Sequence, residues 1–64
     1  MDRVKMVRLK QVVRYTGLGR SSIYKMVSVG EFPKQAKIGL RAVAWVEQEI
    51  IDWLNRRVED RDGK

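Results

Sequence analysis

The sequence predicts a single, mostly α-helical domain with one small β-hairpin. Three stretches carry apolar residues at helical spacing, and a stretch between the second and the third alternates as strands do. The chain has 64 residues, which is enough for one small domain and leaves no room for a cleft between two. We therefore expect one domain over residues 1–64, with an ordered core from 8 to 58 and flexible tails at 1–3 and 59–64.

The first helix is predicted to begin at Leu9. Leu9, Val12 and Val13 follow the i, i+3, i+4 spacing of one helical face. Gly17 should end this helix, because glycine readily adopts the left-handed conformation that often follows a helix end. Residues 1–7 mix charged and apolar side chains, and the pattern leaves open whether they form a short edge strand or a loose arm.

The second helix is predicted to follow after a very short turn. Gly19 is an acceptable N-cap, and Gly30 marks the end of the pattern. The apolar stripe of this helix consists of Ile23, Met26 and Val27. Because only residues 16–19 join the two helices, they should cross steeply as a helix-turn-helix.

The hairpin is predicted to follow Pro33. Pro33 forces the residue before it into an extended conformation and so prevents further helix. Residues 36–38 and 42–45 alternate in the manner of strands, with a turn at Gly39–Arg41 between them. An isolated hairpin is marginally stable in water, so its apolar face must pack on the helices.

The third helix has the strongest helical pattern. Its apolar stripe consists of Ile50, Ile51, Leu54 and Val58, widened by Trp53. Glu47 and Glu49 lie in its first turn, where their negative charges interact favourably with the positive end of the helix dipole. We expect one core, composed of Leu9, Val12, Val13, Leu18, Ile23, Val27, Ile38, Val43, Trp45, Ile50, Trp53 and Leu54.

Positive charge is concentrated in the first two thirds of the chain. The 14 Lys and Arg exceed the 8 Asp and Glu, which gives a net charge of +6. Residues 1–41 hold ten basic and two acidic residues, a net of +8, whereas residues 42–64 hold four basic and six acidic residues, a net of −2. Such segregation implies a basic face, and nucleic acid is the most abundant large polyanion in a cytoplasm. The simpler interpretation is that the excess charge only keeps the protein soluble.

Several classes of function are excluded by what the composition lacks. Cysteine and histidine are absent, so disulfides, thiolate nucleophiles and imidazole bases or metal ligands are absent as well. No nucleophile accompanies the carboxylates, and the two glycines around Leu18 do not form a phosphate loop. We expect no enzyme activity, no cofactor and no metal. No apolar run approaches the ~20 residues that span a bilayer, so we expect a cytoplasmic, nucleoid-associated protein without a membrane partner.

The polar side of the second helix is the strongest candidate for a binding surface. Guanidinium groups can pair with guanine in the major groove, hydroxyl groups can bind phosphates or bases, and a helix start attracts phosphate. No acidic residue interrupts this surface, whose members are Arg20, Ser21, Ser22, Tyr24, Lys25 and Ser28. The hairpin adds Lys34, Lys37 and Arg41 around Gly39, which could reach phosphates or the adjacent minor groove.

Both surfaces also have a simpler interpretation. The helix could present an ordinary solvated face, and the hairpin charges could protect an edge strand from aggregation. Tyr24 could direct its phenol to a phosphate or lean its ring on the hairpin. The helix-turn-helix beside a basic hairpin favours groove insertion for the helix, whereas for the hairpin both interpretations stay open.

Four blocks of the chain run from Arg8 to Tyr24, from Gly30 to Lys34, from Lys37 to Trp45 and from Glu49 to Leu54. Together they resemble the AlpA family of small phage and prophage transcriptional regulators, which are related to MerR-like winged-helix domains and to excisionases. One departure is Gly19, where family members usually carry serine; glycine weakens the N-cap by a few tenths of a kcal/mol.

The resemblance implies a winged helix-turn-helix that binds specific double-stranded DNA and regulates transcription of a prophage or integrative element. By the family pattern, the recognition helix would act through Arg20, Ser21, Ser22, Tyr24 and Lys25, and the wing through Lys37 and Arg41. One alternative is an excisionase that bends attachment-site DNA for an integrase. Another is a protein-interaction module whose basic face meets an acidic partner. Because one helix reads few base pairs, a dimer, a cooperative array on DNA or an integrase partner would add specificity.

Overall fold

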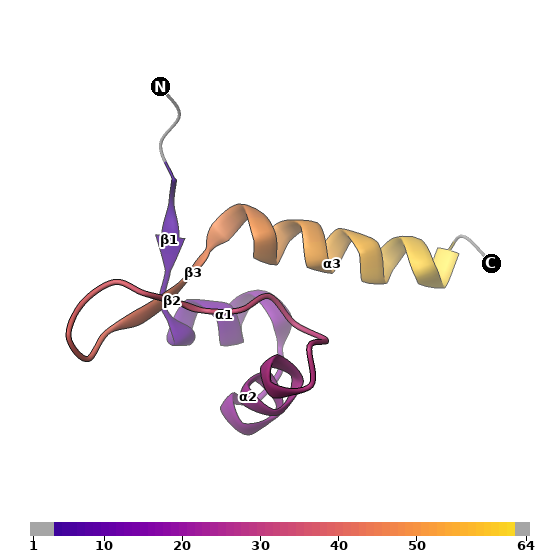
Figure 1. The fold of residues 1–64 in the computed structure, drawn as a ribbon. Helices are drawn as coiled ribbons and strands as arrows, with labels where there is room; N and C mark the ends of the chain where they lie inside the picture. The colour runs from indigo at the N-terminus through magenta and orange to yellow at the C-terminus, as the bar shows by residue number, and fades with distance from the viewer. Residues whose placement is uncertain (1–3, 63–64) are drawn as a thin grey trace.

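The structure is a computed structural model that describes residues 4–62 of the chain (Figure 1). Its elements are β1 (Met6–Val7), α1 (Leu9–Thr16), α2 (Arg20–Ser28), β2 (Ala36–Lys37), β3 (Val43–Val46) and α3 (Glu47–Asp62). The prediction of a mostly helical domain with a hairpin, in the order helix, helix, hairpin, helix, is confirmed. The structure adds a short strand before the first helix.

The turn between α1 and α2 is as tight as the sequence indicates. Gly17 ends α1 with φ of 74°, and its N–H donates to the carbonyl oxygen of Val13 at 2.8 Å. Thr16 still belongs to α1, where its hydroxyl donates to the carbonyl oxygen of Val12 at 2.9 Å. Only residues 17–19 therefore separate the two helices.

The strands form one antiparallel sheet in the order β1-β3-β2. Val7 pairs with Trp45 on one side of β3, and Lys37 pairs with Val43 on the other. The alternative left open for residues 1–7 is thus settled for Met6–Val7, which form an edge strand; residues 1–3 lie outside the described part of the chain.

The core lies where α1, α2 and α3 meet the sheet. The buried apolar residues are Val7, Val12, Ile23, Phe32, Ala44, Trp45 and Ile50. Seven partly buried residues pack against them: Leu9, Val13, Leu18, Met26, Val27, Trp53 and Leu54. The prediction for Ile38 is wrong, because β2 ends at Lys37 and the side chain of Ile38, already in the loop, is 49% exposed.

Helix α3 follows β3 directly and runs further than the sequence pattern indicates. The predicted tail began at residue 59, but Glu59–Asp62 continue the helix, and residues 63–64 lie outside the described part. Trp53 anchors the helix through an edge-on contact with Phe32, with ring centroids 4.7 Å apart. Within residues 4–62, no helix is long and apolar enough to cross a membrane.

Candidate nucleic-acid interface

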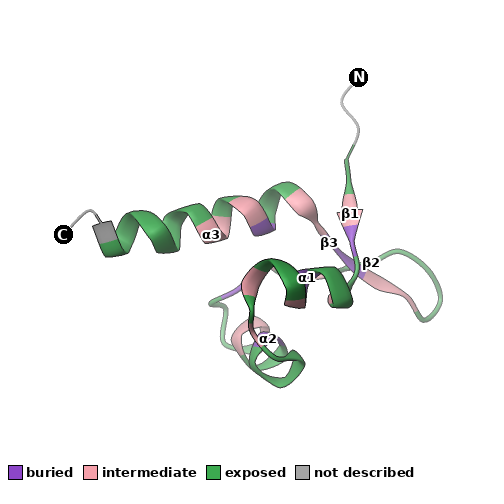
Figure 2. Ribbon diagram, turned by 180° about the vertical axis from the view of Figure 1, so that it is seen from behind, coloured by how far each residue is buried: buried purple, intermediate pink, exposed green. Residues whose placement is uncertain are grey.

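Helix α2 separates its apolar and polar residues cleanly. Ile23 is fully buried, and Met26 and Val27 are half-buried against the core. The predicted binding residues occupy the remaining positions and are all exposed: Arg20, Ser21, Ser22, Tyr24, Lys25 and Ser28. Figure 2 shows this exposed side of α2 on the outside of the molecule, and Figure 1 shows that α1 lies between α2 and α3.

The N-terminal end of α2 has unsatisfied hydrogen-bond donors. Gly19 is the N-cap residue, in an extended conformation with φ of −77°, and offers no side-chain acceptor. The backbone N–H groups of the first turn are therefore available to an external acceptor, and the helix dipole favours a negative one. Arg20 adds a full positive charge at the same end. An anion such as a phosphate is the chemically matched ligand for this position.

For Tyr24, the structure supports the interpretation in which the ring leans on the hairpin, whereas a contact of its phenol with a phosphate stays a prediction. Its ring lies 6.3 Å, centroid to centroid, from the indole of Trp45 on β3, tilted by 47°. The side chain nevertheless remains 39% exposed. Tyr24 therefore leans on the hairpin strand while its exposed part stays on the polar side of α2.

The base of the hairpin lies beside the C-terminal half of α2. A hollow of about 300 Å³ is lined by Val27, Lys34, Gln35, Lys37 and Val43. All three predicted hairpin residues, Lys34, Lys37 and Arg41, are exposed. The hollow brings Lys34 and Lys37 next to α2, whereas Arg41 lies further out in the β2–β3 loop.

Gln35 is a residue of this hollow that the sequence analysis missed. Its Oε1 is buried and has no hydrogen-bond partner. An unsatisfied buried amide oxygen is costly, and an external donor would relieve that cost. No sequence signal distinguishes this glutamine, because the feature depends on how β2 lies against α2.

The basic side chains of this surface are not neutralised within the described residues. Neither the cations of α2 nor those of the hairpin form an ion pair or hydrogen bond with residues 4–62. No carboxylate occurs in residues 19–30 or 32–46. One predicted group is partly committed, since the hydroxyl of Ser28 donates to the carbonyl oxygen of Lys25 at 2.7 Å. The arrangement can bind an extended polyanion through unpaired cations.

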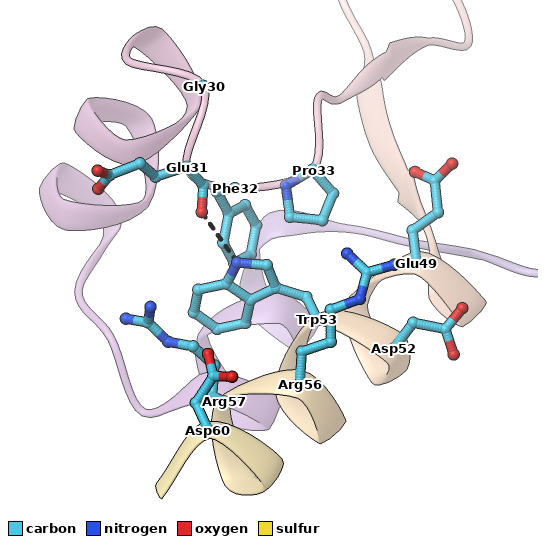
Figure 3. A pocket seen from close by; sticks show the side chains of 10 residues that line it. All are labelled: Gly30, Glu31, Phe32, Pro33, Glu49, Asp52, Trp53, Arg56, Arg57 and Asp60. Atoms are coloured by element: carbon cyan, nitrogen blue, oxygen red, sulfur yellow. Dashed lines mark hydrogen bonds between the residues drawn. The ribbon is translucent and has the colours of Figure 1, made fainter. Parts of the chain in front are cut away.

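A second, larger hollow has a different chemical character (Figure 3). It measures about 560 Å³ and is lined by Gly30, Glu31, Phe32, Pro33, Glu49, Asp52, Trp53, Arg56, Arg57 and Asp60. The indole of Trp53 lies across it, and its N–H donates to the carbonyl oxygen of Glu31 at 2.9 Å. Because carboxylates and guanidinium groups are mixed along its α3 side, this groove does not attract a polyanion as the surface of α2 and the hairpin does.

The remaining charged cluster ties α1 and the N-terminal segment to the start of α3. The hydroxyl of Tyr15 donates to Oε2 of Glu47 at 2.6 Å, and Nζ of Lys5 lies 3.6 Å from the same oxygen. The hydrogen bond to Glu47, helped by desolvation and by the nearby negative charge, raises the pKa of Tyr15 above its usual 10.0. In residues 4–62, no group of carboxylates is arranged to hold a metal ion.

The sequence of this chain matches a known protein family and two relatives. The family model described as prophage CP4-57 regulatory protein (AlpA) matches residues 5–58. The chain is 35% identical over 60 residues to the DNA-binding transcriptional activator AlpA of Escherichia coli (strain K12), covering 84% of this chain and 86% of that protein. It is also 37% identical over 57 residues to the ORF88 protein of Enterobacteria phage P4, covering 89% of this chain and 65% of the phage protein.

Proposed function

Because this chain belongs to the AlpA family of prophage regulatory proteins, we propose that it binds specific double-stranded DNA and regulates transcription of a prophage or integrative element. One relative is named as a DNA-binding transcriptional activator, and another is encoded by a phage. The observation that carries the proposal is the exposed polar side of α2 beside the basic hairpin, whose cations have no partner within residues 4–62.

In the proposed complex, α2 lies in the major groove. The groove is wide enough to admit one helix, and the exposed side of α2 would face the base edges. Arg20 would form two hydrogen bonds with O6 and N7 of a guanine, while the free N–H groups at the start of α2 would bind a phosphate. Ser21, Ser22, Tyr24 and Lys25 would supply hydroxyl and ammonium contacts along the same face. Ser28 would take part only as an acceptor while its hydroxyl donates to Lys25.

The hairpin would act as the wing. Lys34 and Lys37 lie next to α2 and would meet the phosphates that border the major groove. Arg41, further along the loop, would reach the neighbouring backbone or minor groove. These contacts fix the orientation of the protein on the duplex and add affinity that depends on salt.

A single recognition helix reads too few base pairs to select a unique site. We therefore propose that the protein binds as a dimer or as a cooperative array, or beside an integrase. A directionality factor that bends attachment-site DNA is the second candidate, and the exposed tip of the hairpin favours it. Footprinting separates the two: a transcriptional regulator protects DNA beside a promoter, whereas a directionality factor protects several tandem sites within an attachment site and bends them.

The proposal is tested by selecting binding sites from a random-sequence duplex library. We expect enrichment of a short motif and a Kd for that motif far below the Kd for random duplex. Arg20→Ala should weaken binding to the selected motif by about 1–3 kcal/mol and relax the preference at one base position. Arg56→Ala on α3 is the matched control, because it removes the same charge from outside the proposed interface.

Three results would count against parts of this proposal. If no motif is enriched and all duplexes bind equally, the protein is not sequence-specific. If Arg20→Ala and Arg56→Ala cost the same, binding depends on net charge alone and α2 has no special role. If Arg20→Ala weakens random and selected DNA equally, Arg20 contacts a phosphate instead of a base.

A further inference from the structure

The hairpin ends in a leucine that the rest of the described chain leaves in water. Leu40 is 89% exposed, the highest value among the large apolar side chains of residues 4–62 that face solvent. Its neighbour Ile38 is 49% exposed. Single exposed leucines are common on protein surfaces, so the position of this one in its loop decides its meaning.

The residue before Leu40 is Gly39, although the fold does not require a glycine at this position. A Cβ built at Gly39 would meet only the Cβ of Ala42, at 3.6 Å, which is an ordinary van der Waals contact. The φ of Gly39 is not in the left-handed region, where glycine is favoured. Neither packing nor backbone conformation therefore requires glycine at this position. Glycine also occurs where a backbone approaches another molecule closely, and a narrow groove needs such an approach.

The charges around the hairpin tip favour a negatively charged partner. Lys37 precedes Leu40 and Arg41 follows it, and no carboxylate lies between Phe32 and Val46. Neither cation is paired within residues 4–62. A duplex presents phosphates outside and stacked, apolar base faces inside, so it matches an apolar side chain between two cations. Proteins that bind the minor groove insert leucine and similar side chains between base pairs in this way.

We propose that Leu40 inserts from the minor groove between two adjacent base pairs and kinks the duplex. The proposal rests on the proposed function, since it requires that the hairpin meets DNA while α2 occupies the major groove. Lys37 and Arg41 hold phosphates near the inserted side chain, and the bare backbone at Gly39 lets the tip enter. The kink opens the minor groove at the inserted step and bends the DNA toward the major groove of that step.

The test compares DNA bending by wild-type protein, Leu40→Ala and Leu40→Met on the duplex selected above. Bending is measured by energy transfer between dyes at the two ends of the duplex, and unstacking by 2-aminopurine placed at successive positions. Wild type should bend the duplex by about 20–90° and raise the fluorescence at one base step. Leu40→Ala should lose more than half of the bend and the fluorescence rise, and Leu40→Met should keep both. Val58→Ala, which shortens an exposed apolar side chain of α3, is the matched control.

Protein stability should not change in Leu40→Ala, because the side chain has almost no cover in the fold. Affinity should fall about tenfold or more, as expected when a leucine is no longer buried on binding. Gly39→Ala should weaken binding without lowering the melting temperature.

An unchanged bend in Leu40→Ala would overturn the proposal, and a loss of self-association with the bend intact would identify Leu40 as a protein contact. If wild type forms no complex with any duplex, the proposed function itself fails. If it forms a complex in which the DNA stays straight, only the proposed insertion of Leu40 fails.

Discussion

Trp45 is the side chain whose replacement should reveal most about how this small fold holds together. It is fully buried, and its indole N–H donates to the carbonyl oxygen of Pro33 at 2.9 Å. Trp45→Phe removes that donor, which costs about 1–3 kcal/mol when the acceptor stays away from water. The smaller ring also leaves unfilled space, which adds to the cost. We expect a total loss of about 2–3 kcal/mol.

That loss is large for a domain of this size. At ~0.05–0.15 kcal/mol per residue, the whole chain has a stability of about 3–10 kcal/mol. A loss of 2–3 kcal/mol should lower the melting temperature by about 10–20 °C. Trp45→Ala, at about 3–5 kcal/mol, should abolish a cooperative transition or nearly so.

Thermal and urea unfolding followed by far-UV circular dichroism measure these changes. Trp53→Phe is the matched control, because it removes the same N–H from a half-buried indole whose bond to Glu31 lies at the surface. This control should cost clearly less than Trp45→Phe. A Trp45→Phe protein within about 0.5 kcal/mol of wild type would refute the reasoning, since changes of that size are typical of surface positions.

Three further predictions follow from other parts of the structure. Gly17→Ala should destabilise the protein by about 1 kcal/mol, because residue 17 has a left-handed φ. Gly19→Ser should stabilise it by a few tenths of a kcal/mol, because serine adds a side-chain cap to α2. Urea midpoints that shift in opposite directions for the two variants would support both. Lys37→Ala should reduce the slope of log Kobs against log salt by about one for every duplex, and an unchanged slope would remove this lysine from the interface. The raised pKa of Tyr15 implies that its hydrogen bond to Glu47 stabilises the fold below pH 10 and is lost as pH rises through that pKa. Melting temperatures of wild type and Tyr15→Phe should therefore converge in alkali, and a constant difference would contradict this.

Most of the fold was predictable because it depends on local patterns. The helical spacing around Val12 and Ile23 predicted α1 and α2, and Gly17 predicted where α1 ends. The sequence pattern leaves open whether β1 is a strand or a loose arm, because β1 has only two residues and exists through pairing with β3, which is far away in sequence. Helix α3 extends beyond the last residue of its apolar stripe because no glycine or proline interrupts residues 47–62.

The outward orientation of the candidate site was predictable for a related reason. Once Ile23 was assigned to the core, helical geometry placed Arg20 and Lys25 outside, and the structure exposes both. The unsatisfied oxygen of Gln35 and the exposure of Ile38 were not predictable, because each depends on where strand β2 stops and how it lies against α2. That these residues bind DNA stays a prediction until binding is measured.

The contact between Tyr24 and Trp45 has a consequence for the length of DNA that the protein can accept. It joins the middle of α2 to the central strand of the sheet, so the helix and the hairpin keep a fixed separation before any ligand arrives. The helix and the hairpin would therefore contact the duplex at a set spacing. An operator with one base pair inserted between the bases read by α2 and the base step that favours insertion of Leu40 should therefore bind more weakly.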